Sequence, residues 1–298
     1  MTFFELLHNE LSTLLGTIVV LGLLVGSFLN VVIYRLPLMM QREWRQQCHE
    51  FLGLAVDETA EHDTTQQHPV FNLVKPDSHC PQCNAPVRPW QNIPVLSWLF
   101  LKGRCASCQT PISWRYPLIE MTTGLLSGLV AWQFGATWLM LAVLVFTWCL
   151  IAMTVIDIDH HLLPDAITIP LLWLGLLVNA LGLNAQVSLH DAVIGAVAGY
   201  LALWSLYWGF KLLTGKEGMG YGDFKLLAAL GAWMGWQSLL LIVILSSVVG
   251  ALTGIVLLLR GRDRNMPIPF GPYLAGAGLL AMLWGEPLIR LYFAMMAP

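Results

Sequence analysis

The sequence predicts an all-α polytopic membrane protein with about eight transmembrane helices and one small insertion between the first and second spans. Three observations support this fold class. Hydrophobic residues make up 57% of the 298 residues and charged residues only 11%, with a mean hydropathy of +0.67, a balance that is not typical of soluble domains. The hydrophobic residues are gathered in separate long runs. The longest polar stretch is confined to 35–116. The lipid bilayer is therefore an expected partner.

The start of the chain and its overall charge exclude two further classes. Glu5 and Glu10 stand where a secretory signal carries basic residues, and the apolar run that follows is too long for a cleaved signal core. We therefore expect the first hydrophobic segment to be retained. The formal net charge of -3 offers no basic surface for a polyanion, so no nucleic-acid partner is expected.

A helix needs about 20 residues to cross the hydrocarbon core of a bilayer. Seven apolar runs approach or exceed this length: 11–33, 117–134, 138–156, 166–183, 192–210, 238–259 and 272–293. An eighth run, 224–235, would be about 18 Å long as a helix. Its length alone is also compatible with a re-entrant or interfacial helix.

The distribution of basic residues favours a crossing by the eighth run. If 224–235 crosses, one face of the membrane holds the segments 34–116, 157–165, 211–223 and 260–265. That face then carries every Lys and Arg except Arg290, with Lys225 at the start of the short run. Short cytoplasmic loops are enriched in Lys and Arg, so this face is predicted to be cytoplasmic. A re-entrant run would place the arginines of 260–265 outside, and eight spans are therefore favoured.

These assignments divide the chain into three parts. Residues 1–34 form the first span, 35–116 a cytoplasmic domain, and 117–298 a multi-span membrane domain. The first half of the cytoplasmic domain, 41–72, is polar and is interpreted as a charged helix followed by a flexible loop. No convincing internal repeat is visible.

Four cysteines predict a metal site in the cytoplasmic domain. Cys80-Pro-Gln-Cys83 and Cys105-Ala-Ser-Cys108 form two CxxC pairs at close to zinc-ribbon spacing. Two disulfides or a redox motif are the alternatives, which a reducing cytoplasm disfavours. Four thiolate ligands leave no open coordination position, so we expect a structural zinc in a zinc-ribbon-like insertion. Single cysteines at 48 and 149 are interpreted as small buried or spare side chains.

Aspartates next to apolar runs are candidate functional residues, because charge at membrane depth is costly. Asp157 continues the helix face of Leu150 and Met153, which makes it the most deeply placed of three aspartates in 157–165. Asp159 lies about 200° away around the helix and is interpreted as a solvated charge. Asp165 follows a proline at a helix start and is interpreted as an N-cap.

A fourth aspartate, Asp223, opens the short eighth run. It also fits an N-cap, and taken alone the two interpretations weigh equally. Gly218, Gly220 and Gly222 precede it, and glycines allow close backbone approach and unusual dihedral angles. These glycines favour a functional loop over a simple connection.

Asp157 and Asp223 fit the pair of carboxylates that an aspartyl peptidase requires. One carboxylate activates water while the other protonates the carbonyl, and repulsion between them separates their pKa values. The chain has no GxSxG elbow, HExxH helix or P-loop. His160 and His161 lack a third ligand and are interpreted as polar loop residues.

At these motifs the sequence resembles the bacterial type IV prepilin peptidases. The family pattern has an aspartate, six further residues and Pro-Asp or Pro-Asn, followed later by Gly-x-Gly-Asp. Here these are Asp157 with Pro164-Asp165, and Gly220-Tyr-Gly222-Asp223. The spacing selects Asp157 over Asp159. The resemblance extends to Gly26-Ser-Phe-Leu-Asn-Val-Val-Ile-Tyr-Arg-Leu-Pro37 and to the paired CxxC motifs.

The resemblance implies a bifunctional enzyme of the bacterial inner membrane whose active site faces the cytoplasm. Such an enzyme removes the basic leader of prepilins and type II secretion pseudopilins. It then N-methylates the new terminal residue, commonly phenylalanine, with S-adenosylmethionine. Its partners would be these substrates and the pilus or type II secretion machinery. The chain has no GxGxxG loop, so the methyl donor and its association with the cytoplasmic domain rest on the resemblance alone, and its binding residues stay unknown.

Two other functions remain open from the residues alone. Intramembrane carboxylates also relay ions, which would make the chain a transporter or proton pathway. A non-enzymatic component of a secretion or pilus assembly would use the spans and the cysteine cluster for contacts only.

Overall fold

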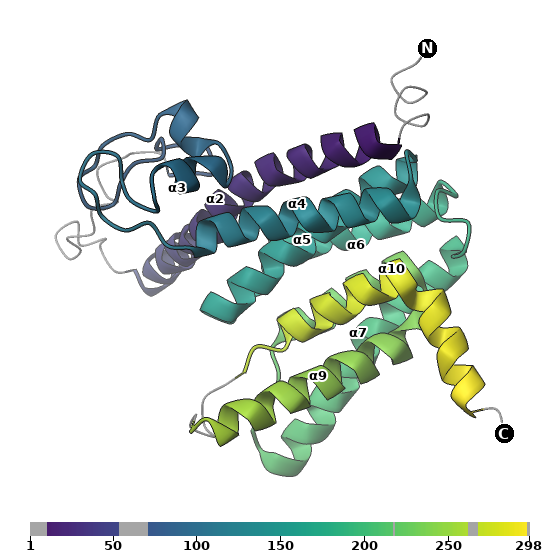
Figure 1. Ribbon diagram of the computed structural model, residues 1–298. Coiled ribbons are helices and arrows are strands. Elements are labelled where there is room, and N and C mark those ends of the chain that lie inside the picture. The colour runs from purple at the N-terminus through teal and green to yellow at the C-terminus, as the bar shows by residue number, and fades with distance from the viewer. Residues whose placement is uncertain (1–10, 54–70, 217, 262–267, 297–298) are drawn as a thin grey trace. The chain divides into compact units, whose positions relative to one another are not determined.

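The computed structural model describes residues 11–53, 71–216, 218–261 and 268–296 (Figure 1). Within these ranges the regular elements are all helical, apart from two isolated antiparallel bridges. In chain order they are α2 (Leu11–Leu52), η1 (Pro89–Asn92), α3 (Leu96–Phe100), α4 (Arg115–Phe134), α5 (Trp138–His160), α6 (Asp165–Ala180), α7 (Leu189–Thr214), α8 (Tyr221–Met234), η2 (Trp236–Ser238), α9 (Leu239–Leu259) and α10 (Gly271–Met296).

The apolar runs of the sequence correspond to helices of the structure. Each of the eight runs lies wholly or mainly in one of the helices. Four helical stretches of the described chain are long and apolar enough to cross a membrane: α2, α5, α7 and Trp236–Leu259, which comprises η2 and α9. In its described ranges the structure thus establishes helical elements with four candidate spans, which is a coarser result than the predicted eight.

The first helix is longer than the sequence predicted. α2 has 42 residues and is about 63 Å long at 1.5 Å per residue, so the predicted first span and the charged helix after it form one element. Pro37 lies inside it. The flexible loop expected at the end of 41–72 falls largely on residues 54–70, outside the described ranges, as do Arg262 and Arg264.

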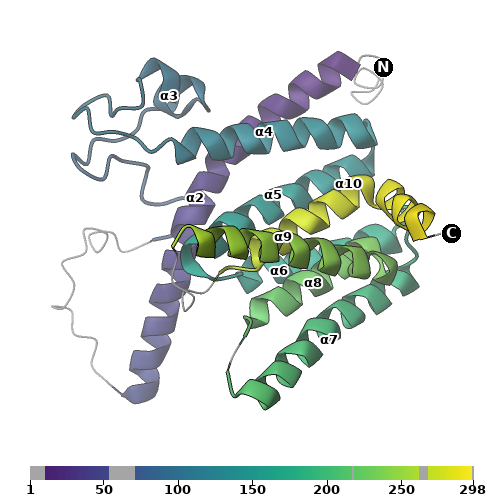
Figure 2. The same ribbon diagram turned by 60° about the horizontal axis from the view of Figure 1, so that its bottom comes forward.

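Contacts between Cα atoms divide the described chain into two compact units. Residues 16–128 form one unit, in which α2 and α4 run side by side (Figures 1 and 2). Arg35 of α2 ties the following segment to this helix, since its guanidinium donates to the carbonyls of Asn72 at 3.0 Å and Pro76 at 2.7 Å. The guanidinium also lies 5.8 Å from the centroid of the Phe71 ring.

The second unit comprises the described residues from 129 onward with Leu11–Leu15. Its central element is α8, which contacts α6, α7 and α10 (Figure 2). From Asp223 to Met234 every residue except Lys225 is buried. α7 packs unusually close to α8 because Gly195 of α7 faces Gly231 of α8. A Cβ on either glycine would overlap the backbone carbonyl of the other. Among the helices that contain the eight apolar runs, α8 is the shortest, with 14 residues, and it is enclosed by protein.

α6 and α10 complete the enclosure of α8. The Trp233 indole N–H of α8 donates to the Leu171 carbonyl of α6 at 2.9 Å, and Asn179 of α6 donates back to the Ala232 carbonyl at 2.8 Å. α10 is bent at Trp284, where φ is −136°, three residues before Pro287. A proline removes a helical hydrogen bond and clashes with the preceding turn, which accounts for the kink visible in Figure 1.

Candidate active site and metal centre

Asp157 lies in the last turn of α5. The helix ends because His161 adopts a left-handed conformation, with φ +52°. The His161 N–H donates a hydrogen bond to the Asp157 carbonyl at 2.9 Å. The Asp157 side chain is only 6% exposed, whereas Asp159 is exposed, as the helix-face argument expected. The backbone N–H of Gly271, the first residue of α10, donates to Asp157 Oδ2 at 3.0 Å.

Asp223 lies in the first turn of α8 and is 7% exposed. The N-cap of this helix is Gly220, so the N-cap interpretation of Asp223 was wrong. Its carboxylate instead reaches back to the Gly220 N–H from the third helical position, as the acidic residue of a capping box does. This hydrogen bond holds the carboxylate at the N-terminus of α8.

The tertiary structure brings Asp157 and Asp223 together, although 65 residues separate them in the chain. Leu163 fills the space between their loops. A Cβ added to Gly222 would lie 2.8 Å from the Leu163 Cβ, and one added to Gly271 would lie 3.2 Å from its Cδ2. The two carboxylates are close enough for their charges to interact. Two buried carboxylates that lie close together repel each other when both are ionised, and this repulsion favours a shared proton.

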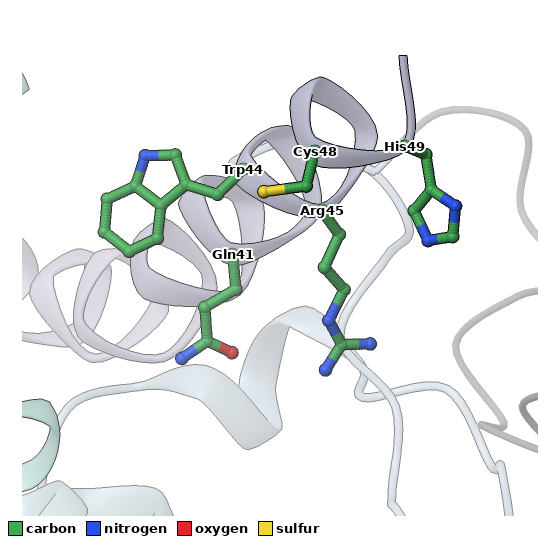
Figure 3. A pocket seen from close by; sticks show the side chains of 5 residues that line it. All are labelled: Gln41, Trp44, Arg45, Cys48 and His49. Carbon is green, nitrogen blue, oxygen red and sulfur yellow. The ribbon is translucent and has the colours of Figure 1, made fainter. Parts of the chain in front are cut away.

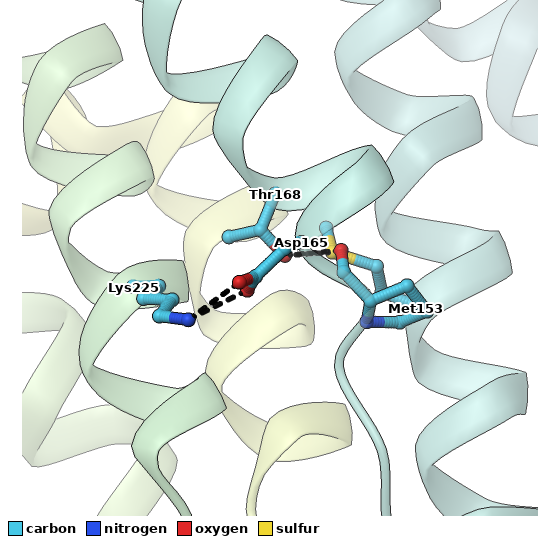
Figure 4. A network of polar contacts seen from close by, with 5 residues as sticks. Met153, Asp165, Thr168 and Lys225 are labelled. Carbon is cyan, nitrogen blue, oxygen red and sulfur yellow. Dashed lines mark hydrogen bonds and ion pairs between the residues drawn. The ribbon is translucent and has the colours of Figure 1, made fainter. Parts of the chain in front are cut away.

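Asp165 has a different structural role from the predicted N-cap. Pro164 occupies the N-cap position of α6, and Asp165 is the first residue of the helix. Both carboxylate oxygens of Asp165 accept from Lys225 Nζ at 2.7 Å (Figure 4). This ion pair holds the start of α6 against α8, two residues after Asp223. Thr168 anchors the same turn by donating to the Pro164 carbonyl at 3.0 Å.

Sequence reasoning missed Gly271 as a site residue. A Cβ at this position would lie 2.5 Å from Asp157 Oδ2, so glycine is required for the hydrogen bond to the carboxylate. The available signal was the run Pro269-Phe-Gly271-Pro272 before the last apolar segment. Two prolines around a glycine indicate a rigid turn, but they do not indicate which side chain the turn contacts.

The four predicted metal ligands also come together. The Sγ atoms of Cys80, Cys83, Cys105 and Cys108 all lie within 4.8 Å of one another, and those of Cys80 and Cys108 are 3.7 Å apart. A tetrahedral zinc site with Zn–S bonds of about 2.3 Å requires sulfur separations of about 3.8 Å. The cluster therefore has the dimensions and donor set of a four-thiolate metal centre.

The electrostatics of the cluster also fit a cation. Hydrogen bonding by Thr110 lowers the pKa of Cys108 to about 6. The backbone N–H of Ala85 lowers the pKa of Cys83, but partial desolvation and the other three sulfurs raise it to about 11. Four crowded thiols cannot all ionise without compensation, and a bound divalent cation removes this conflict.

The two CxxC pairs have the same backbone conformation, a local repeat that was not recognised in the sequence. In each, the N–H of the first cysteine bonds to a carbonyl five residues later, at 3.0 Å for Cys80 and 2.8 Å for Cys105. The residue after each second cysteine has a positive φ, 54° at Asn84 and 59° at Gln109. Both pairs are thus turns that present two sulfurs to one point.

A hollow of about 300 Å³ lies beside the polar half of α2 (Figure 3). Its lining residues all come from this one helix: Gln41, Trp44, Arg45, Cys48 and His49. The Cys48 side chain is exposed. With no second element on its lining, the hollow is an open groove along a helix and carries no site assignment.

Two family models match the chain. Residues 20–134 match the bacterial peptidase A24 N-terminal domain, and residues 144–255, which contain both aspartates, match the type IV leader peptidase family. Curated relatives named prepilin leader peptidase/N-methyltransferase include proteins of Stutzerimonas stutzeri, 57% identical, and Pseudomonas aeruginosa, 56% identical, each over 96% of both chains. One from Neisseria gonorrhoeae is 54% identical over 87% of this chain and 86% of its own. No solved structure matches.

Proposed function

Because the chain belongs to the type IV leader peptidase family, we propose that it removes the basic leader of type IV prepilins and type II secretion pseudopilins and then N-methylates the new N-terminal residue. The relatives that match it over nearly their full length are named for both activities. The observation that carries the peptidase half is the pair of buried carboxylates that α5 and α8 bring together inside the matched residues.

Asp157 and Asp223 are the proposed catalytic residues. One carboxylate, ionised, removes a proton from the attacking water, while the other, protonated, donates to the scissile carbonyl. The Gly271 N–H holds Asp157, and the Gly220 N–H holds Asp223. Gly222 packs against Leu163, whereas a Cβ at Gly220 would meet only Asp223 Oδ2 at 3.7 Å and the Gly222 N at 4.0 Å, so the backbone at Gly220 is open for a peptide strand. The enclosed position of both carboxylates excludes bulk water and strengthens their interaction with the developing charge.

The proposed membrane topology has eight spans in the bacterial inner membrane. Residues 1–34 contain the first span, 35–116 form the cytoplasmic domain, and 117–298 form the peptidase domain. The end of α5 and the start of α8 then lie at the cytoplasmic face, where a prepilin with an apolar helix in the bilayer presents its cleavage site. The distribution of Lys and Arg supports this orientation. α8, with 14 residues, crosses inside the protein rather than against lipid.

Zinc and S-adenosylmethionine are the proposed ligands. The separations of the four sulfurs support zinc at Cys80, Cys83, Cys105 and Cys108, where it would hold the two CxxC turns together without an open coordination position. S-adenosylmethionine supplies the methyl group of the second reaction, as the second half of the relatives' name supports.

We expect the purified protein to contain about one zinc ion per chain. A Cys80→Ser/Cys105→Ser variant should retain roughly a tenth of this zinc content, because the two remaining thiolates bind the ion too weakly. Metal content by mass spectrometry measures this. The variant should also be cut faster by protease between residues 71 and 114. Cys48→Ser, at an exposed cysteine outside the cluster, is the matched control and should keep its zinc. Full zinc content in the double variant would exclude the site.

The proposed function predicts two separable mass changes. We expect the purified enzyme in detergent to remove the leader from a prepilin without S-adenosylmethionine, and to add one methyl group only when it is present. Intact-mass measurement records both products. A transporter or a non-enzymatic assembly component would give neither mass change, so an unprocessed prepilin would favour those alternatives.

A further inference from the structure

Outside the aspartate pair, an unusual buried acidic group is Glu120 of α4. The side chain belongs to the unit of residues 16–128 and is only 8% exposed. It is buried because α2 packs closely at this level, where a Cβ on Gly26 would lie 2.8 Å from the Glu120 Cα. The proposed metal site and the proposed peptidase mechanism do not use this carboxylate.

The hydrogen-bond partners of Glu120 are neutral. The backbone N–H of Val95 donates to its Oε2 at 2.7 Å, and the Ser27 hydroxyl donates to the same carboxylate. A carboxylate offers about four acceptor positions, so the two donors leave roughly half of them for a ligand. Keeping a buried carboxylate ionised costs free energy unless a cation pairs with it. The remaining positions therefore suit a cationic donor.

The donor residue Val95 is held in a strained conformation. Its φ of +60° and ψ of −49° place a β-branched side chain in a region that non-glycine residues avoid. Strain of this kind persists only when the surrounding structure imposes it, and it is concentrated at functional sites. The strained residue directs its N–H at Glu120, which positions one carboxylate oxygen.

An apolar surface begins at the residue that follows Val95. Leu96, Leu99 and Phe100 of α3 are all exposed, although a short water-facing helix ordinarily presents polar side chains. A ligand with an ammonium group at one end and an apolar body behind it fits a buried carboxylate next to such a surface. The new N-terminus of a cleaved prepilin has this chemistry, since an ammonium is followed by phenylalanine and an apolar helix.

We propose that Glu120 binds the N-terminal ammonium of the cleaved prepilin and accepts the proton that this group must lose before methylation. This inference rests on the proposed function. The freed lone pair of the amine forms the new C–N bond as the C–S bond of S-adenosylmethionine breaks and its electron pair remains on sulfur. The methylated amine then carries the positive charge. Glu120 is thus a catalytic residue of the second reaction, and Val95 and Ser27 position it.

The test uses a peptide that already has a free N-terminal phenylalanine, so that methyl transfer is measured without cleavage. Glu120→Gln keeps an acceptor for the Val95 N–H but removes the charge and the base. We expect it to methylate the peptide roughly 100-fold more slowly near neutral pH, the scale of general base catalysis. Leader cleavage of an intact prepilin should persist, because that reaction uses the aspartate pair.

The pH dependence separates catalysis from a structural role. An α-amino group has a pKa of about 7.7–8.0, so above this range the amine needs no base. The deficit of Glu120→Gln should therefore shrink between about pH 6.5 and 9, and Glu120→Asp should restore part of the rate. Glu43→Gln, which removes an exposed carboxylate of α2, is the matched control.

Three outcomes would overturn the proposal. The first is methylation by Glu120→Gln at the wild-type rate, and the second is a deficit that does not change with pH. The third is an equal loss of cleavage and methylation in both the Gln and Asp variants, which would show that Glu120 only anchors Val95. Methyl transfer by the wild-type enzyme in the same assay tests the proposed function separately.

Discussion

Replacing Asp157 or Asp223 by asparagine is expected to lower the rate of leader cleavage by roughly 10⁴-fold, because each change removes either the general base or the general acid. The structure makes asparagine the appropriate substitution. It preserves the side-chain volume in a site where both residues are less than 10% exposed, and its carbonyl oxygen still accepts from the Gly271 or Gly220 N–H. Cleavage is measured from the mass of the prepilin product in single-turnover conditions.

A matched control for this pair is Asp159→Asn, at the exposed aspartate two residues from Asp157. It should cleave at a rate within a few-fold of wild type, since an exposed charge contributes little. The Asp157 and Asp223 variants should unfold at the wild-type temperature in detergent and should still methylate a peptide with a free N-terminus. If either of them retains cleavage within tenfold of wild type, the carboxylate pair is not the catalytic pair.

Gly271→Ala is expected to lower cleavage by roughly 100-fold, since displacing a catalytic group by about 1 Å has an effect of this size. The added Cβ would lie 2.5 Å from Asp157 Oδ2 and 3.2 Å from the Leu163 Cδ2. The carboxylate must rotate away, or the start of α10 must shift and lose its hydrogen bond to Asp157. The turnover number should fall, because the substitution moves a catalytic group rather than a leader-binding surface.

Gly276→Ala provides the control within the same helix, because nothing lies within 4 Å of a Cβ added there. Alanine is a better helix former than glycine by about 1 kcal/mol. This variant should therefore cleave normally and unfold at an equal or higher temperature. Wild-type cleavage by Gly271→Ala would show that the hydrogen bond from Gly271 to Asp157 has no catalytic importance.

Much of the local structure was predictable from the sequence. Hydropathy located eight of the nine α-helices in the described ranges, all but the short α3, because a run of apolar residues specifies a helix wherever lipid or protein excludes water. The helix-face argument separated buried Asp157 from exposed Asp159, since the direction of a helical side chain depends only on the positions of its neighbours. The CxxC spacing predicted two turns that each present two sulfurs, because each turn contains its own geometry, and the fold brings the two turns together.

Predictions that depended on the ends of elements were less accurate. Asp165 and Asp223 were both compatible with N-caps, but Pro164 and Gly220 occupy those positions. Capping patterns rank several residue types similarly, so the competing contacts decide the outcome. For Asp165 the deciding contact is the ion pair with Lys225, which comes from another helix and which no local pattern contains.

The tertiary structure decided which helix faces meet. Close approach of α7 to α8 requires Gly195 opposite Gly231, and this choice of neighbours encloses α8 and sets Asp223 near Asp157. The same packing brings Gly271 to Asp157, and the packing of α2 on α4 buries Glu120 beside Val95. The sequence by itself determined the helices, the cysteine turns and the candidate aspartates, because these follow from local periodicity. The partners of each carboxylate were decided only by the fold, because they depend on the shapes of surfaces far apart in the chain.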